Sequence, residues 1–150
     1  MITFKKGNLL DSPCEALINT VNVVGVMGKG LAKEFKAAYP EMFRKYRAFC
    51  DLGIFKPGEC WTYETGEIQP RFIICFAIKN HWKQPSELQW IRSGLKNLND
   101  QVVEHDIMSI AIPALGCGNG GLEWPVVKEE ILNAHLTYWK SMQVLVYEPS

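Results

Sequence analysis

The chain has 150 residues, of which 47% are hydrophobic and 21% are charged, and these proportions exclude a disordered protein. Sixteen basic and sixteen acidic residues cancel, so only a local patch or pocket could make contact with a nucleic acid. The odd number of cysteines, the lack of a signal peptide and the lack of a long apolar run argue against a secreted or transmembrane protein and predict one cytoplasmic domain over residues 1–150.

Apolar patterns along the chain predict a set of strands. The clearest is the continuously apolar run 72–78, which is typical of a strand that is buried on both faces. The other expected strands lie at 2–5, 16–20, 60–64, 107–112 and 143–147.

Helices are predicted between these strands. Apolar stripes with helical spacing lie at 31–38 and 88–102. Pro40 and Pro125 can each occupy the first turn of a further helix. Ser86, followed three residues later by a glutamine, fits a capping box at the start of the longest helix. Strands that alternate with helices indicate an α/β fold with a largely parallel sheet.

Two glycine-rich loops each follow a predicted strand and lead into a helix. They span residues 19–31 and 113–122. Glycines let backbone amides turn toward an anion, and a helix start adds partial positive charge. The spacings fit neither the dinucleotide fingerprint nor the phosphate-binding loop of nucleoside triphosphatases. Tight turns could explain each loop alone, but two at one edge of a sheet favour a ligand with two phosphates or an extended diphosphate.

The motifs in these loops resemble those of macro domains, in the same order and over essentially the whole chain. The matching segments are Gly7-Asn8-Leu9-Leu10-Asp11, Asn19-Thr20-Val21-Asn22, Gly28-Lys29-Gly30 and the run from Pro113 to Gly121. The segment Phe76–Lys83 is most similar to the DarG branch, antitoxins that reverse DNA ADP-ribosylation by DarT toxins. The resemblance implies a three-layer α/β/α fold with a mixed, largely parallel central sheet.

The same resemblance implies which residues bind ADP-ribose. Asn8 and Leu9 should meet the adenine; many macro domains have aspartate in place of Asn8, but an asparagine can also accept from the adenine amino group. Asn22 should hold the distal ribose, and residues 28–31 and 116–120 should surround the diphosphate. The complete expected set is Asn8, Leu9, Thr20, Asn22, Gly28, Lys29, Gly30, Leu31, Leu115, Gly116, Cys117, Gly118, Asn119 and Gly120.

Lys79 is the candidate catalytic residue, because the DarG branch has an essential lysine at this place. A neutral amine can attack an anomeric carbon or form a Schiff base with the opened sugar. A charged lysine could instead stabilise the departing base. Without the resemblance, a solvated lysine at a strand end would be the favoured interpretation. A related branch that acts on proteins has an aspartate in the second loop, whereas the stretch 118–121 has no acid, which favours action on DNA.

Weaker signals concern contact with DNA. His81, Trp82 and Lys83 combine aromatic and basic groups, as sites for unpaired bases do, but buried packing explains Trp82 equally well. Six basic residues between positions 28 and 50 could follow a DNA backbone or form a solvated surface. Cys117 is not expected to be a nucleophile, since no histidine is near it in sequence. No metal site and no cofactor are expected.

The sequence therefore predicts a glycohydrolase that removes ADP-ribose from a modified base, thymidine in single-stranded DNA, with Lys79 as catalytic residue. The alternatives are a non-catalytic module that binds ADP-ribose and a hydrolase of small ADP-ribose derivatives. The antitoxin resemblance implies ADP-ribosylated single-stranded DNA as substrate and a DarT-like toxin as partner. A monomer satisfies all of these expectations, and no membrane partner is expected.

Overall fold

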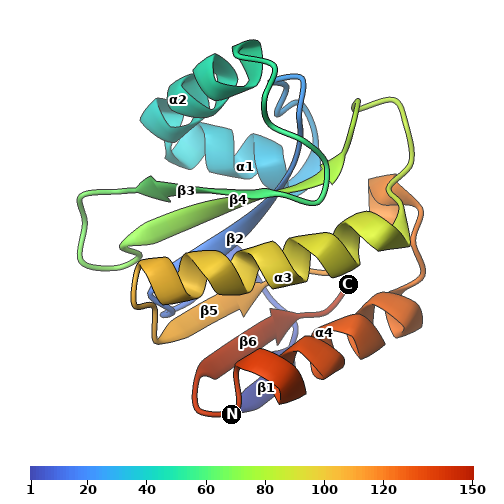
Figure 1. The fold of residues 1–150 in the computed structure, drawn as a ribbon. Helices are drawn as coiled ribbons and strands as arrows, with labels where there is room; N and C mark the ends of the chain where they lie inside the picture. The colour runs from blue at the N-terminus through green and yellow to red at the C-terminus, as the bar shows by residue number, and fades with distance from the viewer.

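The protein, described over residues 1–150 by a computed structural model, has a six-stranded sheet between two pairs of helices (Figure 1). The strand order is β1-β6-β5-β2-β4-β3, and every neighbouring pair is parallel except the β3–β4 hairpin. The predicted three-layer fold with a mixed, largely parallel sheet is confirmed. The strands are β1 Ile2–Lys5, β2 Ala16–Asn22, β3 Cys60–Glu64, β4 Phe72–Lys79, β5 Ser109–Ile112 and β6 Gln143–Tyr147.

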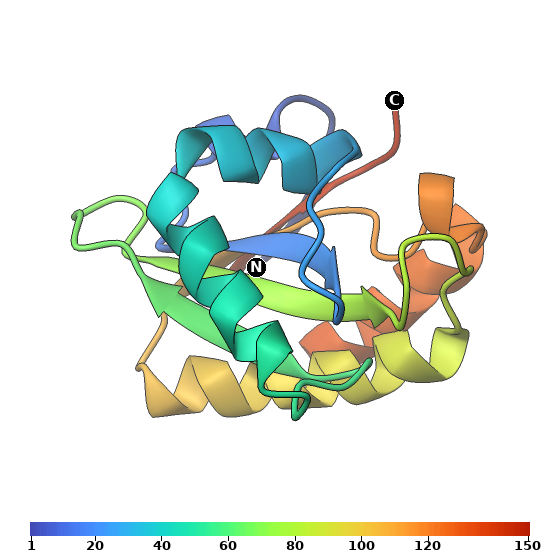
Figure 2. The ribbon, with the colours of Figure 1, turned by 90° about the horizontal axis from the view of Figure 1, so that it is seen from above.

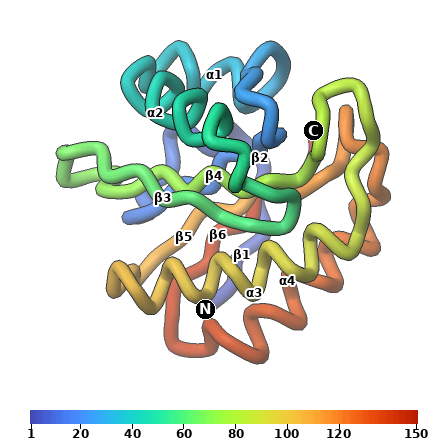
Figure 3. The backbone as a smooth tube through the Cα atoms, turned by 45° about the horizontal axis from the view of Figure 1, so that its top comes forward, coloured from blue at the N-terminus to red at the C-terminus, as the bar shows by residue number.

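The helices divide between the two faces of the sheet, with α1 and α2 on one side and α3 and α4 on the other (Figure 1, and Figure 3 as a tube). Two short 3₁₀ helices, η1 and η2, follow β1 and β5 at the sheet edge where the parallel strands end. The bounds are α1 Gly30–Ala38, α2 Pro40–Asp51, α3 Leu88–Glu104, α4 Trp124–Tyr138, η1 Leu9–Asp11 and η2 Gly118–Gly120.

Alternating residues of the central strands supply both hydrophobic cores. Ile18 and Ile74 are fully buried in the core that α3 and α4 cover. Their neighbours Leu17 and Ile73 point to the opposite core, which contains Phe35 of α1. Because β4 is buried on both faces, its run of apolar residues is continuous.

The structure differs from the sequence predictions at the ends of elements. β2 continues to Asn22 and β4 continues to Lys79. The candidate ribose-binding residue Asn22 and the candidate catalytic residue Lys79 are therefore the last residues of two strands. β5 begins at Ser109 instead of residue 107, because the amides of Ile107 and Met108 donate to the Val102 carbonyl and the Glu15 carboxylate rather than to a neighbouring strand. The predicted capping box is wrong: Glu87 precedes α3 without a side-chain cap, and Ser86 is buried.

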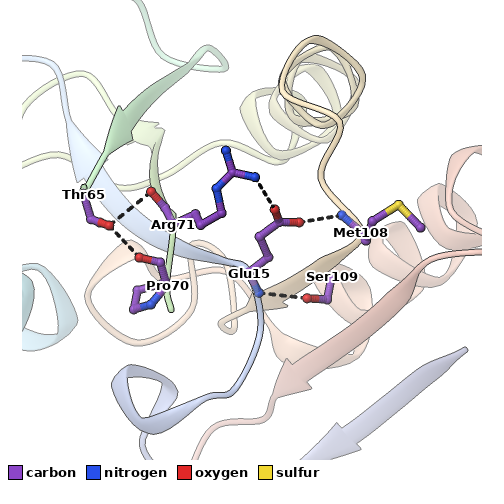
Figure 4. Close-up of polar contacts among 6 residues, drawn as sticks. All are labelled: Glu15, Thr65, Pro70, Arg71, Met108 and Ser109. Carbon is purple, nitrogen blue, oxygen red and sulfur yellow. Dashed lines mark hydrogen bonds and ion pairs between the residues drawn. The ribbon is translucent and has the colours of Figure 1, made fainter. Parts of the chain in front are cut away.

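A polar cluster around Glu15 joins the three central strands at the edge opposite the glycine-rich loops (Figure 4). The Glu15 carboxylate accepts hydrogen bonds from the Met108 amide at 2.9 Å and the Arg71 guanidinium at 3.2 Å. The Glu15 amide donates to Ser109 Oγ at 2.8 Å. These contacts align the starts of β2, β4 and β5, so the carboxyl ends of the same strands are held in register around the candidate site.

Candidate functional site

Asn22 holds the first glycine-rich loop to the end of β2. Its side-chain oxygen accepts from the amides of Val24 at 3.1 Å and Val26 at 3.3 Å, and its Nδ2 donates to the Val26 carbonyl at 2.8 Å. From α2, the buried Tyr46 hydroxyl donates to the Asn22 carbonyl at 2.7 Å. The loop is thus fixed without a ligand, and one N–H of Nδ2 has no partner within the protein.

The first loop ends at the start of α1, where backbone amides are available to an anion. Lys29 precedes the helix and makes no side-chain cap, so the first amides of α1 have no intrahelical partner. Gly30 has a φ of +56°, a conformation that side chains other than glycine rarely adopt. The glycine therefore permits the turn that presents this helix start to the cavity.

The second glycine-rich loop, between β5 and α4, packs against the connection from β4 to α3. The two segments lie side by side in Figures 1 and 2. The Ser86 amide donates to the Gly120 carbonyl at 2.9 Å. A Cβ at Gly120 would lie 2.6 Å from Ser86 Oγ, so only glycine allows this approach.

Lys79 lies at the end of β4, opposite Asn22 in the strand pairing. The residue is 9% exposed, and its Nζ donates to the Asn119 carbonyl at 3.0 Å and the Trp82 carbonyl at 3.3 Å. Burial, and secondly the positive charge of Lys29, lower the pKa of Lys79 below its usual range. The amine is therefore held in place and shifted toward its neutral, nucleophilic form.

The loops, the connection after β4 and Lys79 surround one cavity of about 940 Å³. This volume is near the upper end of the range for small-molecule sites, roughly 300–1,000 Å³. The charged residues of its wall are Lys29, Lys79 and Lys83, with no aspartate or glutamate. A wall of lysines and helix-start amides is suited to a diphosphate.

Most of the predicted site residues meet in this cavity. Those that line it are Thr20, Asn22, Gly28, Lys29, Gly30, Leu31, Lys79, Trp82, Lys83, Cys117, Gly118, Asn119 and Gly120.

Five of the predicted site residues are not in the wall of the cavity. Leu115 is fully buried, and Gly116 packs against Leu122 and Ser86. His81 stacks on Trp82 but does not line the cavity. Asn8 caps η1 through its side chain and Leu9 is in the core, so their contact with adenine stays a prediction.

Several residues that line the cavity were not predicted from the sequence. Pro113, Ala114 and Gly121 belong to the second loop, and their position beside the chosen glycines was the available signal. Gln84 and Pro85 carry no local signal, because only the course of the chain between β4 and α3 brings them to the cavity. The other missed residues are Val21, Val26, Ala32 and Ile78.

Trp82 is an exposed aromatic side chain at the cavity. It is 44% exposed, which does not agree with the interpretation as buried packing. Its ring stacks on His81 with centroids 5.2 Å apart, and Lys83 Nζ lies 5.0 Å from its centroid. The three residues form a compact aromatic and cationic group on a wall that Trp82 and Lys83 share.

Cys117 lines the cavity but is a poor nucleophile. Burial raises the pKa of its thiol, and its Sγ lies 3.7 Å from the Leu115 carbonyl, so the thiolate is disfavoured at neutral pH. The protein contains no cluster of three or more metal-ligating side chains. None of its helices has the length and apolarity needed to cross a bilayer.

Comparison with known proteins gives a consistent family assignment. The macro domain family pattern matches residues 18–131. A curated DNA ADP-ribosyl glycohydrolase of Thermus aquaticus is 47% identical over 150 residues, which cover 99% of this chain and 41% of that protein. The chain thus spans about two fifths of the length of such relatives.

Solved structures agree with this assignment. The macrodomain of Mycobacterium tuberculosis DarG superposes with a TM-score of 0.97 and 44% identity, covering 100% of this chain and 99% of that one. Thermosipho africanus DarTG in complex with ADP-ribose gives a TM-score of 0.89 with 31% identity, over 99% of this chain and 41% of that one. The fold, the paired glycine-rich loops and these matches show that the chain belongs to the macro domain family and is similar to DarG macrodomains.

Proposed function

We propose that the chain is a DNA ADP-ribosyl glycohydrolase that releases ADP-ribose from a thymine-type base in single-stranded DNA. The observation that carries this proposal is Lys79, a nearly buried amine with a lowered pKa in the wall of a cavity whose other charges are also positive. The names of the relatives support the activity, although they are longer than this chain.

The cavity suggests how ADP-ribose is oriented. The diphosphate lies between the start of α1 and η2, next to Lys29, where backbone amides and a cation are available. The free N–H of Asn22 Nδ2 donates to the distal ribose. The adenine extends toward Asn8 and Leu9, which follow β1 at the same edge of the sheet. This orientation brings the anomeric carbon of the distal ribose close to Lys79.

Lys79 acts as a nucleophile in this proposal. A neutral amine has two N–H bonds and one lone pair, and the carbonyls of Trp82 and Asn119 take the two N–H bonds. The lone pair attacks the anomeric carbon, and the bond to the base breaks with its electron pair on the base nitrogen, which then takes the proton released by the amine. The sugar ring of the resulting glycosylamine opens to a Schiff base with Lys79, and water hydrolyses the Schiff base to free ADP-ribose and the amine. This route needs no carboxylate in the cavity, and none is present there.

Trp82 and Lys83 hold the leaving base and its strand. An exposed indole offers a face on which an unpaired base can stack, and Lys83 supplies a cation for the phosphate backbone. The His81 ring stacks on the indole and helps to hold its orientation. These contacts explain a preference for single-stranded over double-stranded DNA, because the base must leave its stack to reach the cavity.

The biological setting follows from the same proposal. The chain, as one macro domain over residues 1–150, acts as a monomer in the cytoplasm, where its five cysteines stay reduced. It counteracts a DarT-like toxin by removing the modification that the toxin adds. A relative named as a fusion of DNA ADP-ribosyl transferase and glycohydrolase supports this pairing.

The proposal is tested with a single-stranded oligonucleotide that carries ADP-ribosylated thymidine. The wild type should release free ADP-ribose, and Lys79→Ala should not, while calorimetry shows that both bind ADP-ribose. Lys96→Ala is the matched control, because it removes an exposed lysine of α3 outside the cavity.

Other results contradict the proposal in distinct ways. Binding of ADP-ribose without release from DNA would make the chain a reader module. Turnover that is restricted to small ADP-ribose derivatives would make it a small-molecule hydrolase. Full activity of Lys79→Ala would show that Lys79 takes no part in the reaction.

A further inference from the structure

A second, smaller cavity lies beside the main one. Its volume is about 390 Å³, and it is lined by Asn80, Gln84, Pro85, Glu87 and Trp90. Gln84 and Pro85 also line the main cavity, so the connection between β4 and α3 is the wall between the two. Asn80 directly follows Lys79 in the chain. A ligand in the small cavity would therefore be a close neighbour of a substrate held at Lys79.

The chemistry of the small cavity is the opposite of that of the main one. Its only charged residue is the carboxylate of Glu87, whereas the main cavity has three lysines and no acid. The Glu87 side chain neither caps α3 nor forms a salt bridge. A free carboxylate repels a phosphate, so the small cavity is unsuited to a second part of the diphosphate or to the DNA backbone.

The same residues are suited to a nucleobase. Trp90 is the one aromatic residue of the lining, and base–aromatic stacking contributes roughly 1–3 kcal/mol per base. The amides of Asn80 and Gln84 can both donate to and accept from a base edge. The Glu87 carboxylate only accepts, so it favours a base that presents an amino group, as glutamate does with cytosine.

We propose that this cavity is a subsite for the base next to the ADP-ribosylated nucleotide, and that it prefers a base with an exocyclic amino group over thymine. The inference rests on the proposed DNA glycohydrolase activity. It assigns a role to a part of the surface that the release of ADP-ribose does not itself require. The wall formed by Gln84 and Pro85 separates the two bases, one at Lys79 and the other at Trp90.

The test compares oligonucleotides that carry ADP-ribosylated thymidine and differ only in the adjacent position. Cytosine, thymine or an abasic site is placed there, on each side separately, and kcat/KM for ADP-ribose release is measured. On one side, cytosine should give a kcat/KM about tenfold above the abasic substrate, with thymine between them. ADP-ribosylated thymidine nucleoside, which has no neighbour, is the reference substrate.

Two variants assign this preference to the small cavity. Asn80→Ala and Glu87→Ala should lower kcat/KM on the cytosine substrate to about the value with thymine, because stacking on Trp90 remains, and should leave turnover of the nucleoside unchanged. Glu87→Ala is the sharper variant, because loss of a negative charge would by itself strengthen DNA binding, whereas the subsite predicts slower turnover. Gln89→Ala, an exposed change on the same helix outside the cavity, is the control.

Three results separate the possible failures. Equal kcat/KM for cytosine and abasic neighbours on both sides would overturn the subsite. A parallel loss on the nucleoside in both variants would also overturn it, because the residues would then act through the position of Lys79. If the wild type releases no ADP-ribose from any of these substrates, the glycohydrolase proposal itself fails and the subsite with it.

Discussion

Lys79 combines two features that seldom occur together at a strand end. Its Nζ is nearly enclosed, yet its hydrogen-bond partners are the neutral carbonyls of Trp82 and Asn119 rather than a carboxylate. A salt bridge would have held the amine in its charged form. Burial and the repulsion from Lys29 act in the opposite direction and lower the pKa of Lys79. The environment thus favours nucleophilic chemistry over a structural role.

The pH dependence of turnover follows from this lowered pKa. The neutral fraction of an amine rises as pH increases through its pKa, so kcat should rise with pH to a plateau. The midpoint should lie below the usual lysine value of about 10.4. Lys29→Met removes the neighbouring positive charge and should move the midpoint to higher pH, whatever it does to binding. A kcat that is flat or falls as pH increases would exclude a neutral Lys79 nucleophile.

The environment of Lys79 could not be predicted from the residues alone. Its carbonyl partners come from positions three and forty residues further along the chain, and no local pattern links them. From the sequence without a family resemblance, a solvated lysine was the favoured interpretation. The resemblance identified the residue, and the fold supplies the burial and the lowered pKa.

At the scale of elements, the connection from β4 to α3 and the second glycine-rich loop support each other. The Ser86 amide donates to the Gly120 carbonyl, and one residue earlier in the loop the Asn119 carbonyl accepts from Lys79. Ser86 Oγ is buried without a hydrogen-bond partner, so this serine occupies a position that costs stability. The close contact places the loop against Lys79.

Gly120→Ala should disturb this contact. The new Cβ would lie 2.6 Å from Ser86 Oγ and 3.2 Å from Ser86 Cβ, so the hydroxyl must rotate and the loop must shift slightly from the connection. We expect ADP-ribose to bind about tenfold more weakly, as measured by calorimetry. Ser86→Gly removes both atoms, and in the double variant it should restore most of the affinity. Failure of the double variant to recover would show that the contact with Ser86 is not the cause.

Element types were easier to predict than element ends. The buried run of β4 and the stripe of α3 are long periodic patterns, and both elements are where the sequence placed them. The capping box failed because tertiary packing of Ser86 against Gly120 overrides the local preference of a serine for the helix start. β2 extends further than predicted because the Asn22 side chain satisfies the loop amides that follow it.

At the scale of the whole molecule, the site and the polar cluster around Glu15 lie at opposite edges of the sheet. The Glu15 carboxylate connects the starts of β2, β4 and β5 through Arg71 and Met108 (Figure 4). The Glu15 side chain is 19% exposed and that of Arg71 is 50% exposed, so the ion pair is partly screened. The hydrogen bond to the Met108 amide therefore supplies the larger part of the contribution of Glu15 to the free energy of unfolding.

Glu15→Ala should therefore lower the free energy of unfolding by about 1–2 kcal/mol, and Arg71→Ala by less than about 1 kcal/mol. For a domain of this size, each kcal/mol corresponds to a decrease in Tm of roughly 2–4 °C. Calorimetric unfolding measures both changes. Affinity for ADP-ribose should remain at the wild-type value, because the cluster is at the far edge. If Arg71→Ala lowered the free energy of unfolding more than Glu15→Ala, the ion pair would contribute more than the Met108 hydrogen bond, and this prediction would be wrong.

The overall architecture was predictable, but the composition of the cavity was only partly so. Strand–helix alternation with two glycine-rich loops indicated the parallel sheet and the edge at which a ligand binds. The strand order and the course of residues 80–87 depend on long-range packing, and for that reason Gln84, Pro85 and the small cavity were not foreseen. Residues that lie in an irregular connection between a strand and a helix show no periodic sequence pattern, even when the connection lines a site.

The central claim is that the Lys79 amine bonds to the sugar while DNA is released. Borohydride added during turnover of an oligonucleotide with ADP-ribosylated thymidine reduces a sugar–lysine Schiff base to a stable product, and mass spectrometry measures it. We predict one ADP-ribose unit per protein, on a peptide that contains Lys79, and none in Lys79→Ala. Rapid release of ADP-ribose with no trapped adduct, or an adduct on another lysine, would contradict the account.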